Sequence, residues 1–315
     1  MKIKILDRKA FGYDTPLEIL SQLGEVTVYD NTSNEKLYER CLDADVLIFN
    51  KIKIDRKTIE GAKSLKLICV FATGYDNIDT EAAKEHGVAV CNVPGYSTES
   101  VTLYTLATVT ALATRLFEYR GYVTSGEYSK SDSANKLTPV YHEIAGKTWG
   151  IIGYGNIGKS VARVAEALGA RVIVNKRTPS GLPNEVDIDT LCKESDVITV
   201  HCPLNDGTRG IINEERLSLM KNDVILVNEA RGAVLEENTV AEFVKAGKLG
   251  GFGCDVYSSE PFGENHPYYA IKELPNVILT PHAAWASYEA RERCVKTIYE
   301  NIKSFTSGGK NNRIV

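Results

Sequence analysis

The sequence of 315 residues has no long apolar run and no strong excess of charge of either sign. Charged residues interrupt the segment from Met1 to Asp7, whereas a secretory signal needs a continuous apolar stretch. No later segment offers the roughly 20 apolar residues that cross a bilayer. The net charge of −4 provides no broad positive field for a polyphosphate backbone. We therefore expect a cytoplasmic protein that binds neither a membrane nor nucleic acid.

Cysteine is scattered along the chain and never occurs in a C-x-x-C pair. The seven cysteines are odd in number, so neither a disulfide framework nor a zinc site is indicated. We expect most of them to be small apolar residues of the core, and we expect no bound metal. No basic residue lies at a spacing that would mark one of them as a nucleophile. Their positions are Cys41, Cys69, Cys91, Cys192, Cys202, Cys254 and Cys294.

Length and composition indicate a globular protein of two domains. A chain of 315 residues is too long for one ordinary core, and 43% hydrophobic with 25% charged residues is typical of globular proteins. Short apolar segments alternate with polar, helix-compatible ones, which is a βαβ pattern. The strands are apolar throughout, as strands covered on both faces must be. A first series lies near 3–6, 26–29, 46–49, 67–71 and 88–91, and a second near 146–152, 172–174, 197–200, 224–227, 251–256 and 277–279.

Three segments differ from this alternation. From Thr98 to about Tyr119 the apolar spacing becomes helical, and a Ser-Thr-Glu-Ser cluster can cap this long helix, which could join two domains. The polar stretch 121–142 has no clear period. It is either an arm that packs on another subunit or a plain surface loop. A last helix is expected at about 286–305.

A glycine motif follows the first strand of the second series. A strand before it and a helical apolar pattern after it give this short motif the context of a dinucleotide site. The glycines would let the backbone approach a pyrophosphate, which the amides and dipole of the helix N-terminus stabilise. The alternative is a glycine turn without a ligand. The motif reads Gly153, Tyr154, Gly155, Asn156, Ile157 and Gly158.

The next strand lacks the acidic residue that usually binds the ribose hydroxyls of NAD. It ends instead in Asn175, Lys176 and Arg177. An acid there would repel a 2′-phosphate, whereas two cations can neutralise one, and arginine can bind its oxygens in a fork. The sequence therefore favours NADP(H), with NAD(H) as the alternative. A solvated basic loop would carry the same residues.

Polar residues at the carboxyl ends of later strands are candidates for chemistry, because ligands bind there in open parallel sheets. Arg231, Glu260 and His282 each follow a strand. A carbonyl that accepts a hydride needs a proton donor near neutral pH, which suits histidine, and a carboxylate orients the ring and stabilises its charged form. A guanidinium holds a substrate carboxylate and polarises the carbonyl. His201 is a rival for His282, since it also ends a strand.

Several motifs, spread over nearly the whole chain, resemble those of the D-2-hydroxyacid dehydrogenase family. Their shared order makes the resemblance more specific than any one motif. Asn50-Lys51 and the segment 281–286 most resemble the glycerate dehydrogenase or hydroxypyruvate (glyoxylate) reductase branch. The motifs are ATGYDNID at 72–79, NVPGYSTESV at 92–101, GYGNIG at 153–158, HCPL at 201–204, NEARG at 228–232, DVY at 255–257 with EP at 260–261, and PH at 281–282.

The resemblance implies roles for individual residues. Arg231 binds substrate, His282 is the acid and base, and Glu260 pairs with His282. The backbone N–H groups of Thr73 and Gly74 hold the substrate carboxylate. Formate dehydrogenases, which are relatives, carry glutamine at the position of Glu260, which argues against that activity. Cofactor contacts are expected from His201, Pro203, Thr208, Ala230 and Asp255, the last two with the nicotinamide.

Four residues depart from the family pattern. Leu103-Tyr104 stands where many relatives have an acidic residue and a histidine, and Glu229 replaces a small or apolar residue. Both changes could reshape the pocket. Lys176 replaces the usual acid, which puts plain NAD dependence in doubt.

The fold implied is two Rossmann-like, doubly wound parallel-sheet domains with an active-site cleft between them. Residues 1–98 and 287–315 would form the substrate domain, and 99–286 the dinucleotide domain. The expected activity is reduction of a small 2-keto acid, hydroxypyruvate or glyoxylate, to the D-2-hydroxy acid by a homodimer. Lys51 could reach the far end of such a substrate, although a solvated loop lysine explains it equally. The competing class is a dinucleotide-sensing corepressor without enzymatic activity.

Overall fold

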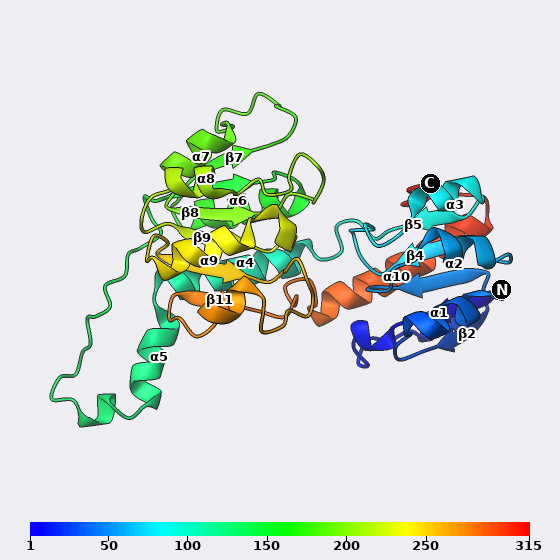
Figure 1. The fold of residues 1–315 in the computed structure, drawn as a ribbon, viewed down its shortest axis with the longest axis horizontal. Helices are drawn as coiled ribbons and strands as arrows, with labels where there is room; N and C mark the ends of the chain where they lie inside the picture. The colour runs from blue at the N-terminus through cyan, green and yellow to red at the C-terminus, as the bar shows by residue number, and fades with distance from the viewer. The chain divides into compact units, whose positions relative to one another are not determined.

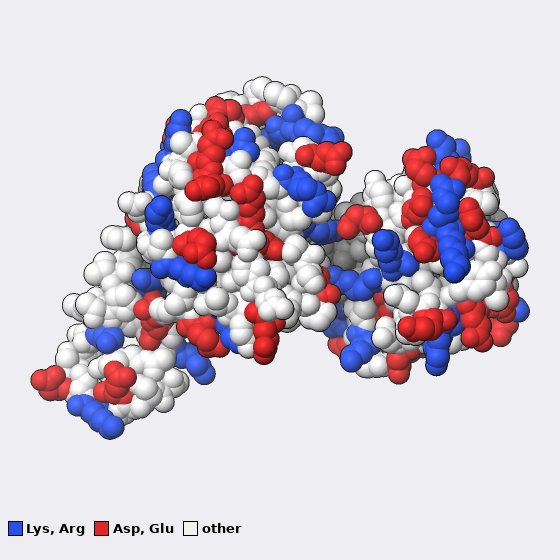
Figure 2. Space-filling model, viewed as in Figure 1, with Lys and Arg blue, Asp and Glu red and all other residues white.

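The computed structural model describes residues 1 to 315, which form two compact units (Figure 1). Unit 1 contains Met1–Ser97 and Ala286–Val315, and unit 2 contains Thr98–Trp285. Unit 2 is therefore an insertion between the two segments of unit 1. Each unit is built on one parallel β-sheet, which confirms the expected α/β class with two Rossmann-like sheets. Basic and acidic side chains are interspersed over the visible face of each unit (Figure 2).

Unit 1 contains a five-stranded parallel sheet. Its strands are β1 (Lys2–Ile5), β2 (Glu25–Val28), β3 (Val46–Phe49), β4 (Leu67–Val70) and β5 (Ala89–Cys91). Its helices are α1 (Asn34–Cys41), α2 (Arg56–Gly61), α3 (Thr80–Glu85) and α10 (Tyr288–Thr306), with 3-10 turns at Arg8–Ala10 and Glu18–Gln22. The strand order is β2-β1-β3-β4-β5, and α10 packs against β4. The N–H of Ile314 donates to the carbonyl of Val90 at 2.7 Å, so the second chain segment also closes onto β5.

Unit 2 contains a six-stranded parallel sheet. Its strands are β6 (Thr148–Ile152), β7 (Arg171–Asn175), β8 (Val197–Val200), β9 (Ile225–Asn228), β10 (Gly251–Cys254) and β11 (Val277–Leu279). Its helices are α4 (Thr98–Ala113), α5 (Leu116–Thr124), α6 (Asn156–Ala167), α7 (Ile188–Glu194), α8 (Glu214–Leu219) and α9 (Glu237–Lys245), with 3-10 turns at Tyr128–Lys130, Gly232–Val234 and Pro267–Ile271. The order is β11-β10-β9-β8-β6-β7, so β7 lies on one side of β6 and the later strands β8 to β11 follow on the other side. The strand order therefore reverses at β6, although all strands are parallel. Such a reversal is where ligands bind at the carboxyl ends of strands.

Helix α4 belongs to the core of unit 2, where it packs against α6, β9 and β10. Thr105 and Val109 on α4 are fully buried. Near the start of α4, the hydroxyl of Ser100 donates to the carbonyl of Ala284 at 2.6 Å. The first and last turns of unit 2 therefore lie side by side.

The single helix expected from Thr98 to about Tyr119 is wrong in one respect. The chain forms α4 and then α5, and Arg115 between them adopts a left-handed conformation with φ of 55°. This conformation ends one helix and allows the next to leave at a 65° bend. Helix α5 therefore leads into the segment 125–144, which contains only one short 3-10 turn.

None of the individual helices combines the length and the hydropathy of a membrane-spanning segment. Helices α4 and α5 satisfy the length and composition test only when they are taken together, across their bend. All seven cysteines are buried and unpaired.

Candidate active site

The glycine turn joins β6 to α6 at the point where the sheet of unit 2 changes direction. Gly153 has φ of +96°, and a Cβ on it would lie 2.5 Å from the backbone nitrogen of Cys202. A Cβ on Gly158 would lie 2.2 Å from the carbonyl oxygen of Gly153. In contrast, the space in front of Gly155 is open. The turn therefore has the close packing and the open approach to a 12-residue helix that a pyrophosphate needs.

The rest of this motif and the end of β7 line the same edge of the sheet. Asn156 is exposed at the start of α6, and Ile157 packs against the core. Asn175 donates from Nδ2 to the carbonyl of Val186 at 3.0 Å, so its amide fixes the loop that follows β7. Lys176 is half-buried and Arg177 is exposed.

An acidic residue, Glu185, also lies near Lys176 in this loop. Hydrogen bonds from Ser180 lower the pKa of Glu185, and Lys176 contributes to the same shift. The carboxylate therefore stays ionised, and its negative charge cancels part of the positive potential of Lys176. Sequence reasoning did not single out Glu185, which lies nine residues further along the chain.

The loop after β8 contains His201, Pro203 and Thr208. Both ring nitrogens of His201 are buried without a hydrogen-bond partner in the chain, and burial lowers its pKa to about 3. A neutral imidazole is a poor proton donor near pH 7, so this burial favours His282 over His201 as the proton donor. Thr208 donates to the carbonyl of Pro203 at 2.6 Å and accepts from the N–H of Asn205 at 2.9 Å. Its hydroxyl therefore shapes the loop.

His282 follows β11 and has a left-handed backbone, with φ of 55°. Such a conformation costs on the order of 1–3 kcal/mol and needs support from its surroundings. Asp255, at the end of β10, provides that support. Its Oδ1 accepts from the N–H of Ala283 and its Oδ2 from the N–H of Ala284, each at 2.8 Å. Its Oδ1 also accepts from the hydroxyl of Thr280 at 2.6 Å. The structure thus places Asp255 as the anchor of the His282 turn.

The ring of His282 is oriented by a carboxylate. Its Nδ1 lies 2.7 Å from Oε2 of Glu260, and Oε1 of Glu260 accepts from the N–H of Tyr257 at 3.1 Å. Because Glu260 accepts a hydrogen bond from Nδ1, Nε2 is the nitrogen that can exchange a proton with a substrate. The sequence-predicted pair is therefore brought together.

Arg231 lies in a turn that an amide side chain holds from both sides. Oδ1 of Asn228 accepts from the N–H of Ala230 at 3.0 Å, and Nδ2 of Asn228 donates to the carbonyl of Arg231 at 3.0 Å. The guanidinium Nη1 donates to the carbonyl of Ala230 at 2.8 Å. The first residue after this turn, Gly232, has no space for a side chain, because a Cβ would lie 2.1 Å from the backbone of Tyr257.

The contact at Gly232 places the Arg231 turn directly against the loop that carries Glu260. The structure therefore gathers Arg231, Glu260 and His282 on adjoining loops of unit 2. Asn228 and Gly232 belong to the motif NEARG at 228–232, but their holding roles were not predicted from the sequence. A glycine that follows a charged residue at a strand end is the signal that could have indicated such a close approach.

Glu229 is buried and faces helix α4. Thr105 shares a short hydrogen bond with its Oε2, and Thr108 lies 3.4 Å from its Oε1. Burial, reinforced by the charge of Asp255, raises the pKa of Glu229 to about 8. The hydroxyl of Thr105 is also 2.8 Å from the carbonyl of Val101 and has only one proton to donate. Both observations fit a protonated Glu229.

Leu103 and Tyr104, two further departures from the family pattern, lie on α4. Leu103 is 66% exposed and Tyr104 is half-buried. Glu229 itself is bound to the threonines of α4, so the structure places it as an anchor of the strand end. The expectation that it could reshape the pocket stays a prediction.

The substrate candidates Lys51, Thr73 and Gly74 lie in unit 1, after β3 and β4. Lys51 is exposed, and its N–H donates to Oδ2 of Asp7 at 2.7 Å. Asp7 also accepts from the N–H of Asn50 at 3.0 Å, and burial raises its pKa to about 6. The backbone N–H groups of Thr73 and Gly74 donate to no group of the chain. They resemble an anion-binding pair of amides.

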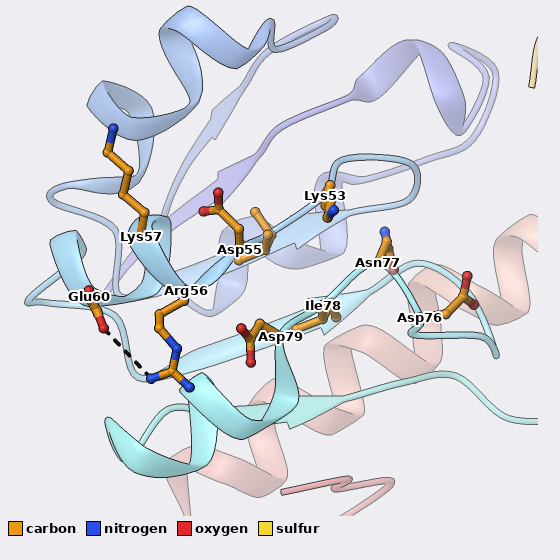
Figure 3. Close-up of a pocket in the computed structure, with 10 residues that line it drawn as sticks. Lys53, Asp55, Arg56, Lys57, Glu60, Asp76, Asn77, Ile78 and Asp79 are labelled. Atoms are coloured by element: carbon orange, nitrogen blue, oxygen red, sulfur yellow. Dashed lines mark ion pairs between the residues drawn. The ribbon is translucent and has the colours of Figure 1, made fainter. Parts of the chain in front are cut away.

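A hollow of about 650 Å³ lies elsewhere in unit 1, beside α2 and α3 (Figure 3). Two of its carboxylates cap helices, since Asp55 caps α2 through the N–H of Thr58 and Asp79 caps α3 through that of Ala82. Arg56 forms an ion pair with Glu85 at 2.5 Å. None of the candidates for substrate or cofactor binding lines this hollow.

Comparisons with known proteins agree with this geometry. A sequence model of the D-isomer specific 2-hydroxyacid dehydrogenase, NAD binding domain, matches residues 106–284. The chain is 36% identical to the glycerate dehydrogenase of Methylorubrum extorquens over 313 residues, covering 99% of this chain and 98% of that one. It is 35% identical to the hydroxypyruvate reductase of Blautia hydrogenotrophica over 322 residues, with 98% of each covered.

The chain is also similar to a solved structure of an acyclic imino acid reductase in complex with NADPH and D-Arg, with a TM-score of 0.87 and 31% identity. The match covers 100% of each chain. The glycine cradle and the unpartnered nitrogens of His201 fit a dinucleotide in unit 2. The chain belongs to the D-isomer specific 2-hydroxyacid dehydrogenase family and is a nicotinamide-dependent oxidoreductase that interconverts a 2-keto acid and a D-2-hydroxy acid.

Proposed function

We propose that Arg231, Glu260 and His282 carry out the chemistry. The observation that carries this proposal is the 2.7 Å hydrogen bond between Nδ1 of His282 and Oε2 of Glu260. It orients the ring and places the charge of Glu260 beside it, so Nε2 is assigned to proton exchange with the substrate. Arg231, on the adjoining turn, would bind the substrate carboxylate through its guanidinium fork.

The roles of these side chains follow from the charge that develops during reduction. A bound nicotinamide dinucleotide supplies the hydride for the carbonyl carbon. The carbonyl oxygen then becomes negative, and Nε2 of His282 gives it a proton, while Arg231 stabilises the charge. Glu260 stabilises the imidazolium before the transfer. In the oxidation direction, neutral His282 takes the proton from the hydroxyl group.

For the substrate, we propose hydroxypyruvate or glyoxylate, which would give D-glycerate or glycolate. The names of the two relatives support this choice. We assign 1–98 and 287–315 to substrate binding and 99–286 to the dinucleotide. The free amides of Thr73 and Gly74 would take the carboxylate, and Lys51 the polar far end of the acid. The names of the relatives, which are dehydrogenases and reductases, do not favour the corepressor alternative.

For the cofactor, we propose a preference for NADPH over NADH. Lys176 and Arg177 follow β7 where no acid is present to repel a 2′-phosphate. Structural relatives include one complex with NADPH and one with NAD, so the preference rests on Lys176 and Arg177 alone. Glu185 beside Lys176 makes the attraction smaller than two unopposed cations would give.

We also propose that two copies of the chain form a homodimer through the segment 116–144. This segment exposes many apolar side chains, among them Leu137 and Val140, which are 80% and 67% exposed. Phe117 and Val123 on α5 are also exposed. So much accessible apolar surface on one arm is typical of a protein interface.

The proposed location of the protein is the cytoplasm. Its seven unpaired cysteines are consistent with a reducing compartment.

The assignment of the acid and base is tested with His282→Ala. Turnover of hydroxypyruvate should fall by several orders of magnitude, while NADPH still binds, as followed by fluorescence titration. His201→Ala is the matched control. In this variant the affinity for NADPH should fall more than kcat. Turnover near that of the wild type in His282→Ala would refute the assignment.

A further inference from the structure

A second pair of a carboxylate and an imidazole lies in unit 2, beside the loop that carries Glu260. Glu237 is the first residue of α9, and His266 precedes the 3-10 turn Pro267–Ile271. Nε2 of His266 lies 3.1 Å from Oε2 of Glu237. Their side chains are only 6% and 10% exposed, and the mechanism uses neither. Desolvating an ionisable pair costs free energy, so such a pair is stable only where further hydrogen bonds compensate that cost.

Hydrogen bonds fix the protonation of this pair. Nδ1 of His266 accepts from the backbone N–H of Tyr268 at 3.2 Å, so the ring proton is on Nε2 and is donated to Glu237. Oε1 of Glu237 accepts from the N–H of Ser258 at 2.9 Å, and Oε2 accepts from the hydroxyl of Ser258. One carboxylate therefore receives three hydrogen bonds from two places on the same loop.

Glu260 lies between these two attachment points. It comes two residues after Ser258 and six before His266. Most residues from 258 to 265 are exposed, so the loop has little apolar burial of its own to order it. Phe262 is the exception, since its ring packs 4.9 Å from that of His266 and 4.6 Å from that of Tyr257.

We propose that Glu237 is a positioning residue, which through Ser258 and His266 holds Glu260 in place for its bond to His282. This inference rests on the roles proposed above for Glu260 and His282. Fixing both sides of an exposed loop removes conformations in which Glu260 points away from the ring. A carboxylate suits this task because it accepts all three donors, whereas an amide has one oxygen and turns an N–H toward at least one of them.

The test compares Glu237→Gln with Glu236→Gln in the full-length protein. Glu236 is the adjacent, exposed glutamate, and its substitution should leave turnover unchanged. For Glu237→Gln we expect kcat to fall about tenfold, roughly the effect of one lost hydrogen bond to a charged group. NADPH affinity should stay the same, and the alkaline limb of the pH–rate profile should move to lower pH. The same shift is expected for Glu260→Gln, because each change weakens the carboxylate contact that stabilises the protonated ring of His282. Glu237→Asp, which keeps the charge, should recover part of the rate.

A double mutant separates this role from a general loss of structure. If Glu237 acts through Glu260, Glu237→Gln has little further effect on kcat in a Glu260→Gln background. An equal loss in both backgrounds, or no loss in the wild-type background, overturns the proposal. Ser258→Ala, which removes one of the three bonds, should give a smaller change in the same direction if Glu237→Gln does not fold. Wild-type turnover in Glu260→Gln would instead refute the proposed function itself.

Discussion

Replacing Glu229 by glutamine should stabilise the protein relative to the wild type, and this gain in stability should be larger at pH 8 than at pH 5. Glutamine has the shape of the protonated acid, and its amide can donate to Thr105 while its oxygen accepts from Thr108. The substitution therefore preserves the two contacts with α4. It removes only the ability to ionise. The wild-type carboxyl must be kept neutral in the fold, since burial raises its pKa to about 8.

The sign of the effect follows from proton linkage. Below pH 4.5 the carboxyl is protonated in both the folded and the unfolded chain, so its contribution to stability is fully present. Between pH 4.5 and about 8 the unfolded chain releases the proton and the folded chain keeps it, so stability falls. The loss is at most about 1.4 kcal/mol per pH unit, or about 5 kcal/mol over the whole interval. Above the folded pKa no further loss occurs.

Thermal unfolding from pH 5 to pH 9 measures this difference. At about 2–4 °C per kcal/mol for a domain of this size, Glu229→Gln should gain roughly 10 °C on the wild type between pH 5 and pH 8. Relaxation around an ionised carboxyl makes this an upper figure. Glu236→Gln, at an exposed site, is the control and should follow the wild type. If the Glu229→Gln curve also runs parallel to the wild type, the carboxyl is already ionised in the fold and the reasoning fails.

Three further outcomes are expected. Lys176→Asp should shift the ratio of kcat/KM for NADPH and NADH toward NADH by tenfold or more, since a charge-assisted phosphate contact contributes about 1.5–3 kcal/mol. Added salt should weaken the preference of the wild type for NADPH. An unchanged ratio in Lys176→Asp would mean that the cation points into solvent. Lys51→Ala should lower the rate on hydroxypyruvate more than on pyruvate, and equal losses would remove it from substrate selection. Asp7→Asn should raise the KM for the keto acid several-fold and leave NADPH affinity unaltered, because one amide oxygen replaces a carboxylate that holds two backbone N–H groups; an unchanged KM would show that the Lys51 loop needs no such anchor.

Much of the fold was predictable because the sheets are parallel and buried. Strands expected at 46–49, 197–200 and 277–279 coincide with β3, β8 and β11, since a strand covered on both faces is apolar throughout. The turn at Arg115 was not predictable from periodicity. The apolar spacing continues across it, and only the left-handed backbone of one residue separates the two helices.

The candidate site was predictable where a residue type is tied to its chemistry, as for a histidine after a strand with a carboxylate on the next loop. The residues that hold the site were less accessible. Glu229 meets Thr105 across 124 residues of chain, and Ser258 meets Glu237 across 21. Such partners carry no local signal, because their proximity follows from strand order rather than from spacing. The roles of the site residues in turnover stay predictions.

The hydrogen bond between Ser100 and Ala284 has a consequence for how this protein can be divided. It holds the two ends of unit 2 together, so residues 98–285 could be excised as one piece, or closed by a short linker, without stretching the chain. The glycine turn and Arg231, Glu260 and His282 would all remain in that piece. Lys51 and the amides of Thr73 and Gly74 would remain in the other. From the roles proposed above for the two units, we expect that a different unit 1 grafted at residues 97 and 286 changes substrate selection and leaves the proposed acid and base in place.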